Sequence, residues 1–328
     1  MDSDDIPENI ADELEEISGL LDESFATRTL KTYGYKWNRY SDYCEDQGVQ
    51  ALPSHPGVVS AYLLTRSKKW TTQTVQGDRL AISWKHRSSG YDDPTDNQLV
   101  SRTMRAVHQR ADPNEGSGKM HALLTEDIKK MIDSLLLDTP SNEGVWEKAM
   151  RLRALRDQAL ILLGFAAALR ASEIAGVQAK DFEFNQEGME LHLSDTKTNV
   201  PRIIGVSRVE DVRYCPVRSL KRWTSSADIT SGPVFRRVHN SAQLGDHEID
   251  RRTVWRIIKG AAKDAEIDDA DQVGAHSVRR GHATQAALND VPLERLRRQL
   301  GHKDPATTAG YIQDARRMQE ETSQELGL

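Results

Sequence analysis

The stretch ADPNEGSGK, residues 111–119, divides the chain more sharply than any other feature of its sequence. Proline, glycine, serine and asparagine dominate it, and this composition is typical of a linker. Apolar residues recur at helical spacing on both sides of it. Because 328 residues is also long for one compact domain, we expect two domains joined by this linker.

The segment before the linker, residues 24–110, predicts a helical domain. Leu30, Tyr33, Trp37, Tyr40 and Cys44 follow one another at spacings of three or four residues, which places them on one face of a helix. Further helices are expected over about 58–66, 69–87 and 98–110.

The segment after the linker, residues 120–328, predicts a domain that combines helices with a small antiparallel β-sheet. Residues 125–136 and 154–177 have helical patterns, and the second run is apolar enough to lie in a core, with Arg170 ending its apolar part. In residues 188–206, apolar and polar side chains alternate on both sides of a polar centre, which predicts a β-hairpin. Helical patterns return from about residue 216, with interruptions, to the end, so the expected fold class is mainly α with a small antiparallel sheet.

Charge is distributed unevenly along the chain, although the formal net charge is only −6. Residues 1–23 hold ten acidic residues and no lysine or arginine, which leaves 44 basic and 40 acidic residues, a balance of +4, for residues 24–328. Residues 24–118, with 13 basic and nine acidic residues, account for this excess. We therefore expect a disordered acidic leader beside a basic domain that suits a nucleic acid; the leader is either a solvated tail or a competitor of phosphates for the basic surface.

Other sequence features bear on where the protein works. No run of about 18 apolar residues is present, so no membrane span is expected. The acidic N-terminus does not resemble a signal peptide, and two isolated cysteines, Cys44 and Cys215, do not form a disulfide framework. These features favour a cytoplasmic protein.

Polar groups that suit chemistry at a phosphate occur in four places. They are Arg170 in AAALRASEIAG, Lys197 in SDTKTN, His276 with Arg279 in GAHSVRRGHATQAAL, and His302 with Tyr311 in QLGHKDPATTAGYI. Two arginines can hold both non-bridging oxygens of a phosphate, lysine and histidine can move protons, and a tyrosine hydroxyl can attack phosphorus. Because arginines can supply the charge that a metal ion supplies elsewhere, no metal and no cofactor is expected.

Each of these residues, taken alone, also fits a structural role. Arg170 can pair with Glu173 three residues later, Lys197 can be solvated in a turn, His276 can cap a helix, and Tyr311 can anchor a core.

Competing kinds of site fit the sequence less well. A metal site built from His276, His282 and His302 is disfavoured, because an offset of six residues puts the first two on different faces of a helix. Neither a Walker-type glycine-rich loop nor a Gly-x-Ser-x-Gly elbow is present in the sequence.

The order and spacing of the motifs resemble the tyrosine recombinases, the phage integrase family with its Cre-like and Xer-like members. ALRASEIAGVQAKDF (168–182) resembles the first arginine motif of the family, and SDTKTN (194–199) resembles its lysine hairpin. HSVRRGHAT (276–284) resembles the His-x-x-Arg motif, and LGHKDPATTAGYI (300–312) resembles the Leu-Gly-His segment followed by the nucleophilic tyrosine. The resemblance covers about residues 125–315, and residues 24–110 are similar to the family's helical core-binding domain.

This resemblance implies a site-specific recombinase or integrase that cleaves and rejoins DNA through a 3′-phosphotyrosine bond, without metal or ATP. The core-binding and catalytic domains would close around DNA as a C-shaped clamp. Arg170 and Arg279 would clamp the phosphate, Lys197 would protonate the 5′-hydroxyl leaving group, His276 would help activate or orient Tyr311, His302 would hydrogen-bond the phosphate, and Glu173 would orient Arg170 or His276.

The resemblance also implies partners and a location. The partner would be a double-stranded DNA site, bound by a dimer, with a tetramer in the synapse whose subunits are joined by the tail from residue 312. The protein would lie in the cytoplasm on the nucleoid, with a prokaryotic, viral or plasmid origin. Two alternatives stay open: a type IB topoisomerase-like enzyme that relaxes DNA, and a non-catalytic DNA-binding regulator.

Basic and polar residues outside the four motifs are candidates for DNA contacts. They are Lys68, Lys69, Thr72, Gln73, Lys85, His86, Arg87, Arg102 and Arg105 in the first domain, and Arg251, Arg252 and Arg256 in the second. The segment 68–76 places four of them at a helix N-terminus, which favours phosphate. Each one alone also fits a solvated surface side chain.

Overall fold

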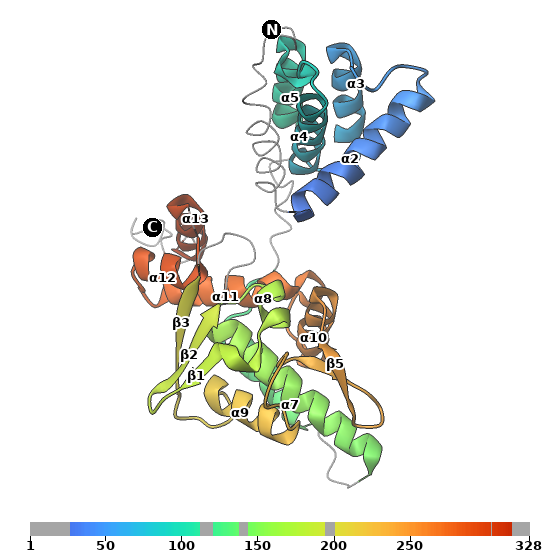
Figure 1. The fold of residues 1–328 in the computed structure, drawn as a ribbon. Coiled ribbons are helices and arrows are strands. Elements are labelled where there is room, and N and C mark those ends of the chain that lie inside the picture. The colour runs from blue at the N-terminus through green and yellow to red at the C-terminus, as the bar shows by residue number, and fades with distance from the viewer. Residues whose placement is uncertain (1–26, 112–120, 138–143, 194–200, 303, 317–328) are drawn as a thin grey trace, which may run out of the picture. The chain divides into compact units, whose positions relative to one another are not determined.

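The chain divides into two compact units, Met1–Gly118 and Lys119–Leu328, which we call the first and second units. The computed structural model describes residues 27–111, 121–137, 144–193, 201–302 and 304–316 (Figure 1). These residues are mostly helical and include two small antiparallel sheets, so the predicted fold class is confirmed. None of the described helices is long and apolar enough to cross a membrane.

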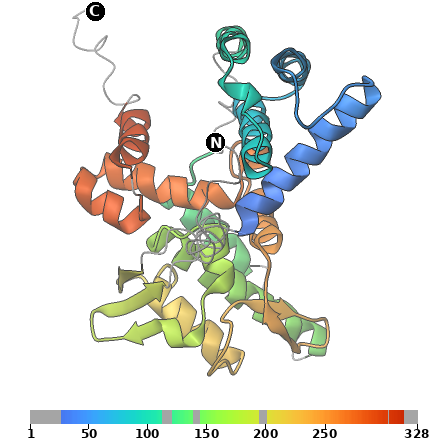
Figure 2. The same cartoon turned by 45° about the horizontal axis from the view of Figure 1, so that its top comes forward.

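Four α-helices build the described part of the first unit. They are α2 (Thr27–Asp46), α3 (Pro56–Ser67), α4 (Thr72–Ser88) and α5 (Gln98–Arg110). Local chemistry explains where they begin, because the Thr71 side chain accepts a hydrogen bond from the Thr74 amide and the Asn97 side chain accepts one from the Leu99 amide. Helix α2 packs along α4, and α3 lies beside α5, as Figure 2 shows with both helices seen nearly end-on.

A buried carboxylate joins three helices of the first unit. Asp78 on α4 is 1% exposed, and its oxygens lie 3.1 Å from Lys36 Nζ, 2.9 Å from Arg66 Nε and 3.7 Å from Arg39 Nη1. Lys36 and Arg39 belong to α2, and Arg66 belongs to α3. A carboxylate removed from water requires such partners, so this cluster fixes the helices relative to one another.

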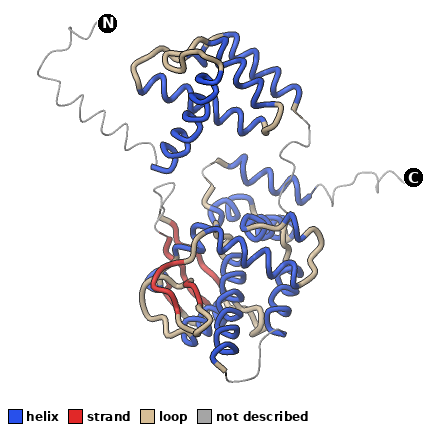
Figure 3. The backbone as a smooth tube through the Cα atoms, turned by 90° about the vertical axis from the view of Figure 1, so that its right-hand side faces the viewer, coloured by secondary structure: helices blue, strands red, loops and turns tan. Residues whose placement is uncertain are grey.

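The second unit combines eight described α-helices with five described strands. The helices are α6 (Thr125–Leu137), α7 (Val145–Ala166), α8 (Ala171–Gly176), α9 (Pro216–Ser226), α10 (Arg251–Asp264), α11 (Ala275–Leu288), α12 (Leu293–Leu300) and α13 (Pro305–Arg316). The strands are β1 (Phe182–Phe184), β2 (Gly188–Leu193), β3 (Arg202–Ser207), β4 (Arg236–Val238) and β5 (Leu244–Glu248). Figure 3 shows the helices of each unit in blue and the short strands of the second unit in red.

The three-stranded sheet has the order β1-β2-β3, with all neighbours antiparallel. Strands β2 and β3 pair from Gly188 with Ser207 to Leu193 with Arg202, so the predicted hairpin is confirmed. The β4–β5 pair, which lies in an interruption of the helical pattern after residue 216, was not predicted. Strand β4 has only three residues and β5 reads LGDHE, so neither shows the apolar alternation by which a strand is recognised.

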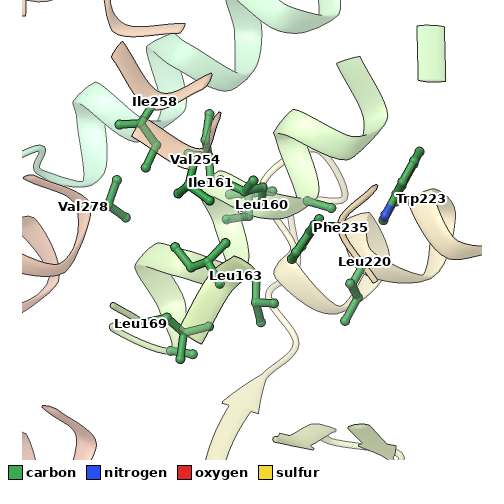
Figure 4. Close-up of a cluster of buried hydrophobic side chains, with 14 of the residues drawn as sticks. Leu160, Ile161, Leu163, Leu169, Leu220, Trp223, Phe235, Val254, Ile258 and Val278 are labelled. Carbon is green, nitrogen blue, oxygen red and sulfur yellow. The ribbon is translucent and has the colours of Figure 1, made fainter. Parts of the chain in front are cut away.

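Helix α7 crosses the centre of the second unit, and its apolar residues form the core predicted for them. Leu160, Ile161 and Leu163 lie among side chains from α9, α10 and α11 (Figure 4). The predicted apolar run, however, is not one helix. It stops at Ala166, Ala168 adopts a left-handed φ of 53°, and Arg170 becomes the residue that caps α8. Because neither glycine nor proline marks this turn, the sequence pattern continues through it.

Replacing Asp78 by alanine should strongly destabilise the first unit. Three cationic side chains would be left around a cavity without their carboxylate, at a cost of about 3–5 kcal/mol. Urea unfolding of the full chain, followed by circular dichroism, measures the change. The control Asp42→Ala removes an exposed acid from α2 and should change stability by less than about 0.5 kcal/mol; equal effects of the two substitutions would contradict the role given to Asp78.

His282 on α11 should make stability depend on pH. Its ring packs edge-on against Phe165, with ring centroids 5.9 Å apart, and burial lowers the pKa of His282 to about 4. Between an unfolded pKa of about 6.5 and the folded value, the unfolded chain binds a proton that the folded chain does not, so stability falls as pH drops through this window. His282→Gln should therefore give a shallower decline of the melting temperature between about pH 6.5 and 4, and an unchanged decline would contradict this account.

Candidate active site

Four segments of the second unit bring the motif residues together. They are the N-terminus of α8, the first turns of α11, the end of α12 and helix α13. Helix α12 ends at Leu300 and is capped by Gly301, whose left-handed φ of 61° allows the chain to turn sharply, and α13 then packs against α11 and α12. Residues 130 positions apart therefore meet, as shown by the 3.4 Å hydrogen bond from Arg170 Nη2 to the Gly301 carbonyl across a separation of 131 residues.

Arg279 lies at the centre of the site and is 3% exposed. Its Nη1 donates to the Ala168 carbonyl at 2.6 Å, and its Nη2 donates to the Leu300 carbonyl and lies 3.0 Å from His302 Nε2. Burial, and then the positive charge of Arg170, lower the pKa of Arg279 to about 10, which still leaves it charged at neutral pH. Among the described residues it forms no ion pair, so this buried cation keeps its charge available for an anion.

Arg170 is held by a carboxylate rather than buried. Its Nη1 lies 2.6 Å from Glu173 Oε1, and its backbone amide donates to Glu173 Oε2 at 2.7 Å. Glu173 thus caps α8 and also binds the Arg170 side chain, so the ion pair considered as the structural alternative is present. Its role in orienting Arg170 for a reaction stays a prediction. The pair does not neutralise the site, because Arg202 shares the same carboxylate and Arg279 forms no ion pair among the described residues.

His302 is fixed at both ring nitrogens. Its Nδ1 lies 2.9 Å from the hydroxyl of buried Thr308, and its Nε2 faces Arg279. Arginine can only donate, so Nε2 accepts and the ring proton is on Nδ1, donated to Thr308 Oγ1. Burial and the charges of Arg279, Arg170 and Arg202 lower the pKa of His302 to about 4, so the ring is neutral at pH 7.

Tyr311 lies beside His302 in the same chain. The two rings stack with their centroids 6.0 Å apart and an angle of 17° between their planes. Tyr311 is half-buried and packs against the small cluster that contains Ala168, Leu296 and Leu300. The structural alternative, a core anchor, therefore describes the ring correctly, but the ring is also part of the arginine–histidine site.

Two further motif residues are His276 and Lys197. His276 lies in the first turn of α11, one turn before Arg279, and is exposed. Lys197 lies outside the described residues.

Arg202, at the start of β3, belongs to the site and was not predicted. Its Nη2 lies 2.8 Å from Glu173 Oε2, which places a second arginine beside the carboxylate that holds Arg170. A signal was present in the sequence: Arg202, Ile204 and Val206 occupy alternate positions of the predicted strand, and the two apolar residues are buried. A charged residue on the inward side of a strand requires a partner, and this argument would have singled out Arg202.

Most of the candidate DNA contacts are accessible side chains. Lys68, Lys69, Gln73, Arg102, Arg105, Arg251, Arg252 and Arg256 are exposed, and Thr72 and Lys85 are half-buried. Arg87 is exposed but paired with Asp93 and Asp96 at 2.9 and 3.0 Å. Except for His86, these residues stay predictions.

His86 is a correction to that set. It is completely buried, with Nε2 accepting from the Ser54 amide at 3.0 Å and Nδ1 lying 2.8 Å from the Ile82 carbonyl. Both ring nitrogens therefore serve the core of the first unit, and the ring is not available to DNA. The basic run KHR suggested an exposed face, but position 86 lies on the inner side of α4 with Val75 and Ile82.

One described group has the composition of a metal site. Glu183, Glu190 and His192 project their ligand atoms within 4.8 Å of one another across β1 and β2. All three side chains are substantially exposed, His192 the least at 39%, and His192 Nε2 lies 3.6 Å from Glu183 Oε1. Exposed acidic groups of this kind are common without an ion, so we assign no metal to them.

Comparison with known proteins agrees with the geometry. The model of the phage integrase family matches residues 136–318. The integrase/recombinase xerD homolog of Selenomonas ruminantium is 31% identical over 299 residues, covering 89% of this chain and 83% of that protein. Recombinase cre of Escherichia phage P1 is 24% identical over 312 residues, covering 89% and 85%.

Solved structures share the fold. XerH recombinase bound to a palindromic difH substrate gives a TM-score of 0.65 at 14% identity, covering 89% of this chain and 78% of that one. A lambda integrase dimer bound to a COC′ core site gives 0.58 at 13% identity, covering 92% and 76%. The family model covers more than half of the chain and one relative exceeds 30% identity over most of both chains. The chain therefore belongs to the phage integrase family and is a tyrosine recombinase, an enzyme of DNA strand exchange.

Proposed function

We propose that this recombinase acts at a specific DNA site through a covalent 3′-phosphotyrosine intermediate, with neither a metal ion nor ATP. The observation that carries the proposal is the stacking of Tyr311 on His302 beside the buried Arg279. A hydroxyl, a neutral imidazole and a buried cation thus share one small volume of a single chain. Because one chain supplies all three groups, we expect Tyr311 to cleave DNA within the site of its own subunit.

The charge of the site suits a reacting phosphodiester. Arg170, Arg202 and Arg279 carry three positive charges, Glu173 carries one negative charge, and His302 is neutral, which leaves a net charge of +2. A phosphodiester brings one negative charge and the attacking tyrosinate oxygen brings a second. Fixed cations that match the charge of the transition state lower the barrier without a metal ion.

In the proposed step, the Tyr311 oxygen attacks phosphorus and the bond from phosphorus to the 5′ oxygen breaks. The tyrosine proton leaves during the attack, assisted by His276, and the departing 5′ oxygen takes a proton from Lys197, which lies outside the described residues. The DNA 3′-phosphate is then bonded to Tyr311. Attack by a 5′-hydroxyl of another strand reverses the step, and because the phosphoester bond energy is kept, no ATP is consumed.

His302 changes its partner in this proposal. In the structure its Nε2 accepts from Arg279, so it has no proton there for a phosphate. An entering phosphate oxygen would compete for the Arg279 proton, and its negative charge would raise the pKa of the imidazole. His302 would then carry a proton on Nε2 and donate it to the phosphate, while Thr308 continues to hold Nδ1.

The proposed partner is duplex DNA, bound by a dimer on one site and by a tetramer in the synapse. Two solved structures with this fold are a lambda integrase dimer bound to a core site and a lambda integrase tetramer bound to a Holliday junction. The exposed basic side chains of both units would supply the phosphate contacts. Work on DNA implies a place on the nucleoid in the cytoplasm, and the tail expected to join subunits lies mostly outside the described residues.

Tyr311→Phe should abolish the covalent DNA adduct and leave DNA binding unchanged. The substitution keeps the stacked ring and removes only the hydroxyl that attacks phosphorus. A nicked suicide substrate, analysed on a denaturing gel, measures the adduct, and a mobility shift measures binding. Tyr91→Phe, at an exposed tyrosine of the first unit, is the matched control and should form the adduct normally.

The same assay separates this proposal from its alternatives. An adduct that persists in Tyr311→Phe would overturn the assignment of the nucleophile. Relaxation of supercoiled DNA without exchange between sites would favour a topoisomerase, and DNA binding by the wild type without any adduct would favour a non-catalytic regulator.

Removal of divalent metal should leave cleavage unaffected. Because three arginines supply the positive charge of the site, the rate of adduct formation in excess EDTA should equal the rate in magnesium. Single-turnover cleavage of the suicide substrate, without ATP, measures both rates. A rate that collapses in EDTA and returns with added Mg²⁺ would contradict the proposed chemistry.

A further inference from the structure

Arg202 connects the three-stranded sheet to two parts of the arginine site. It is the first residue of β3, opposite Leu193 of β2, and its side chain is 15% exposed. Nη2 lies 2.8 Å from Glu173 Oε2, and Nη1 donates to the Gln299 carbonyl at 3.4 Å. One guanidinium thus reaches the cap of α8 and the last turn of α12 together.

The Glu173 carboxylate is shared between two arginines. Oε1 accepts from Arg170 Nη1, and Oε2 accepts from the Arg170 amide and from Arg202 Nη2. With Arg202 present, the charge of the carboxylate is divided between two cations. Without Arg202, the full negative charge of Glu173 would face Arg170 alone, which would weaken the field that Arg170 presents to a phosphate.

Gly301 shows how closely Arg202 approaches the Leu-Gly-His turn. A Cβ built at Gly301 would collide with the Arg202 guanidinium, and the left-handed φ of 61° already disfavours other residues there. The residue immediately before His302 therefore lies directly against Arg202. The guanidinium supports the turn that aims the imidazole.

We propose that Arg202 is a positioning residue of the cleavage site. It holds Glu173 and the turn at residues 299–302, so that Arg170 and His302 keep their places around the phosphate. The proposal rests on the proposed function, because the group being positioned is a DNA phosphodiester. Arg202 itself bonds to the carboxylate and to a carbonyl, and its effect on the reaction passes through those groups.

Two variants test this role. Arg202→Met keeps the length of the side chain and removes its charge and donors, and Arg202→Lys keeps the charge but cannot bond two groups with a planar fork. Arg208→Met is the matched control, because Arg208 is an exposed arginine just after the same strand, bonded to the Asn185 carbonyl. Thermal unfolding and mobility shifts establish that each variant folds and binds DNA.

The decisive measurement compares two nicked suicide substrates in single-turnover cleavage. One has an ordinary scissile phosphodiester, and the other has a methylphosphonate there, which lacks one negative charge. Arg202→Met should slow cleavage of the phosphodiester roughly 10- to 100-fold, because charge stabilisation depends on accurate placement. It should slow cleavage of the methylphosphonate less than about fivefold, since that substrate depends less on fixed cations. Arg202→Lys should lie between Arg202→Met and the wild type.

Each result bears on one proposal or the other. Wild-type cleavage rates in Arg202→Met would overturn the positioning role, and so would equal losses on the two substrates, which indicate a purely structural defect. If Arg202→Met does not fold, Arg202→Lys is compared on both substrates, and equal losses there have the same meaning. A wild type that binds DNA and never forms an adduct would overturn the proposed function, and this inference with it.

Discussion

The buried guanidinium of Arg279 joins segments of the second unit that are far apart in the chain. It extends from α11 and bonds to the carbonyl of Ala168, after α7, and to the carbonyl of Leu300, at the end of α12. A cation removed from water is tolerated only where its donors are satisfied, so these carbonyls must stay in place. The positions of these two carbonyls fix the start of α8 on one side and the Gly301–His302 turn on the other. Tyr311 lies on α13, the helix that follows this turn.

Both units contain a cluster of basic side chains with one carboxylate, but the two clusters differ in which charge is buried. Each contains three basic side chains and one carboxylate. In the first unit Lys36, Arg39 and Arg66 all lie within 3.7 Å of Asp78, whereas in the second unit Arg170 and Arg202 bind Glu173 and Arg279 forms no ion pair among the described residues. In the first unit the acid is the most deeply buried member, and all three cations point at it. In the second, the most buried member is a cation without an acidic partner among the described residues, so the cluster keeps positive charge for a ligand.

Several elements were predictable because the information is local. The helices of the first unit show apolar spacing and capping side chains, and the β2–β3 hairpin shows alternation. The break after Ala166 and the β4–β5 pair were not predictable, since an apolar run continues through the first and no alternation marks the second. His86 was misjudged because a basic run in the sequence does not reveal which side of a helix faces the core.

The sequence by itself determined the residue types of the site and their order: arginine with a glutamate three residues on, His-x-x-Arg, and Leu-Gly-His followed by a tyrosine. The tertiary structure decided which of these groups are buried, which tautomer His302 adopts, that Tyr311 stacks on its own chain's imidazole, and that Arg202 belongs with them. The physical reason is the separation along the chain of the residues that interact. Helical and strand periods are set by neighbouring residues, whereas burial and charge pairing depend on segments that meet only when the chain has folded, such as Arg170 and Gly301.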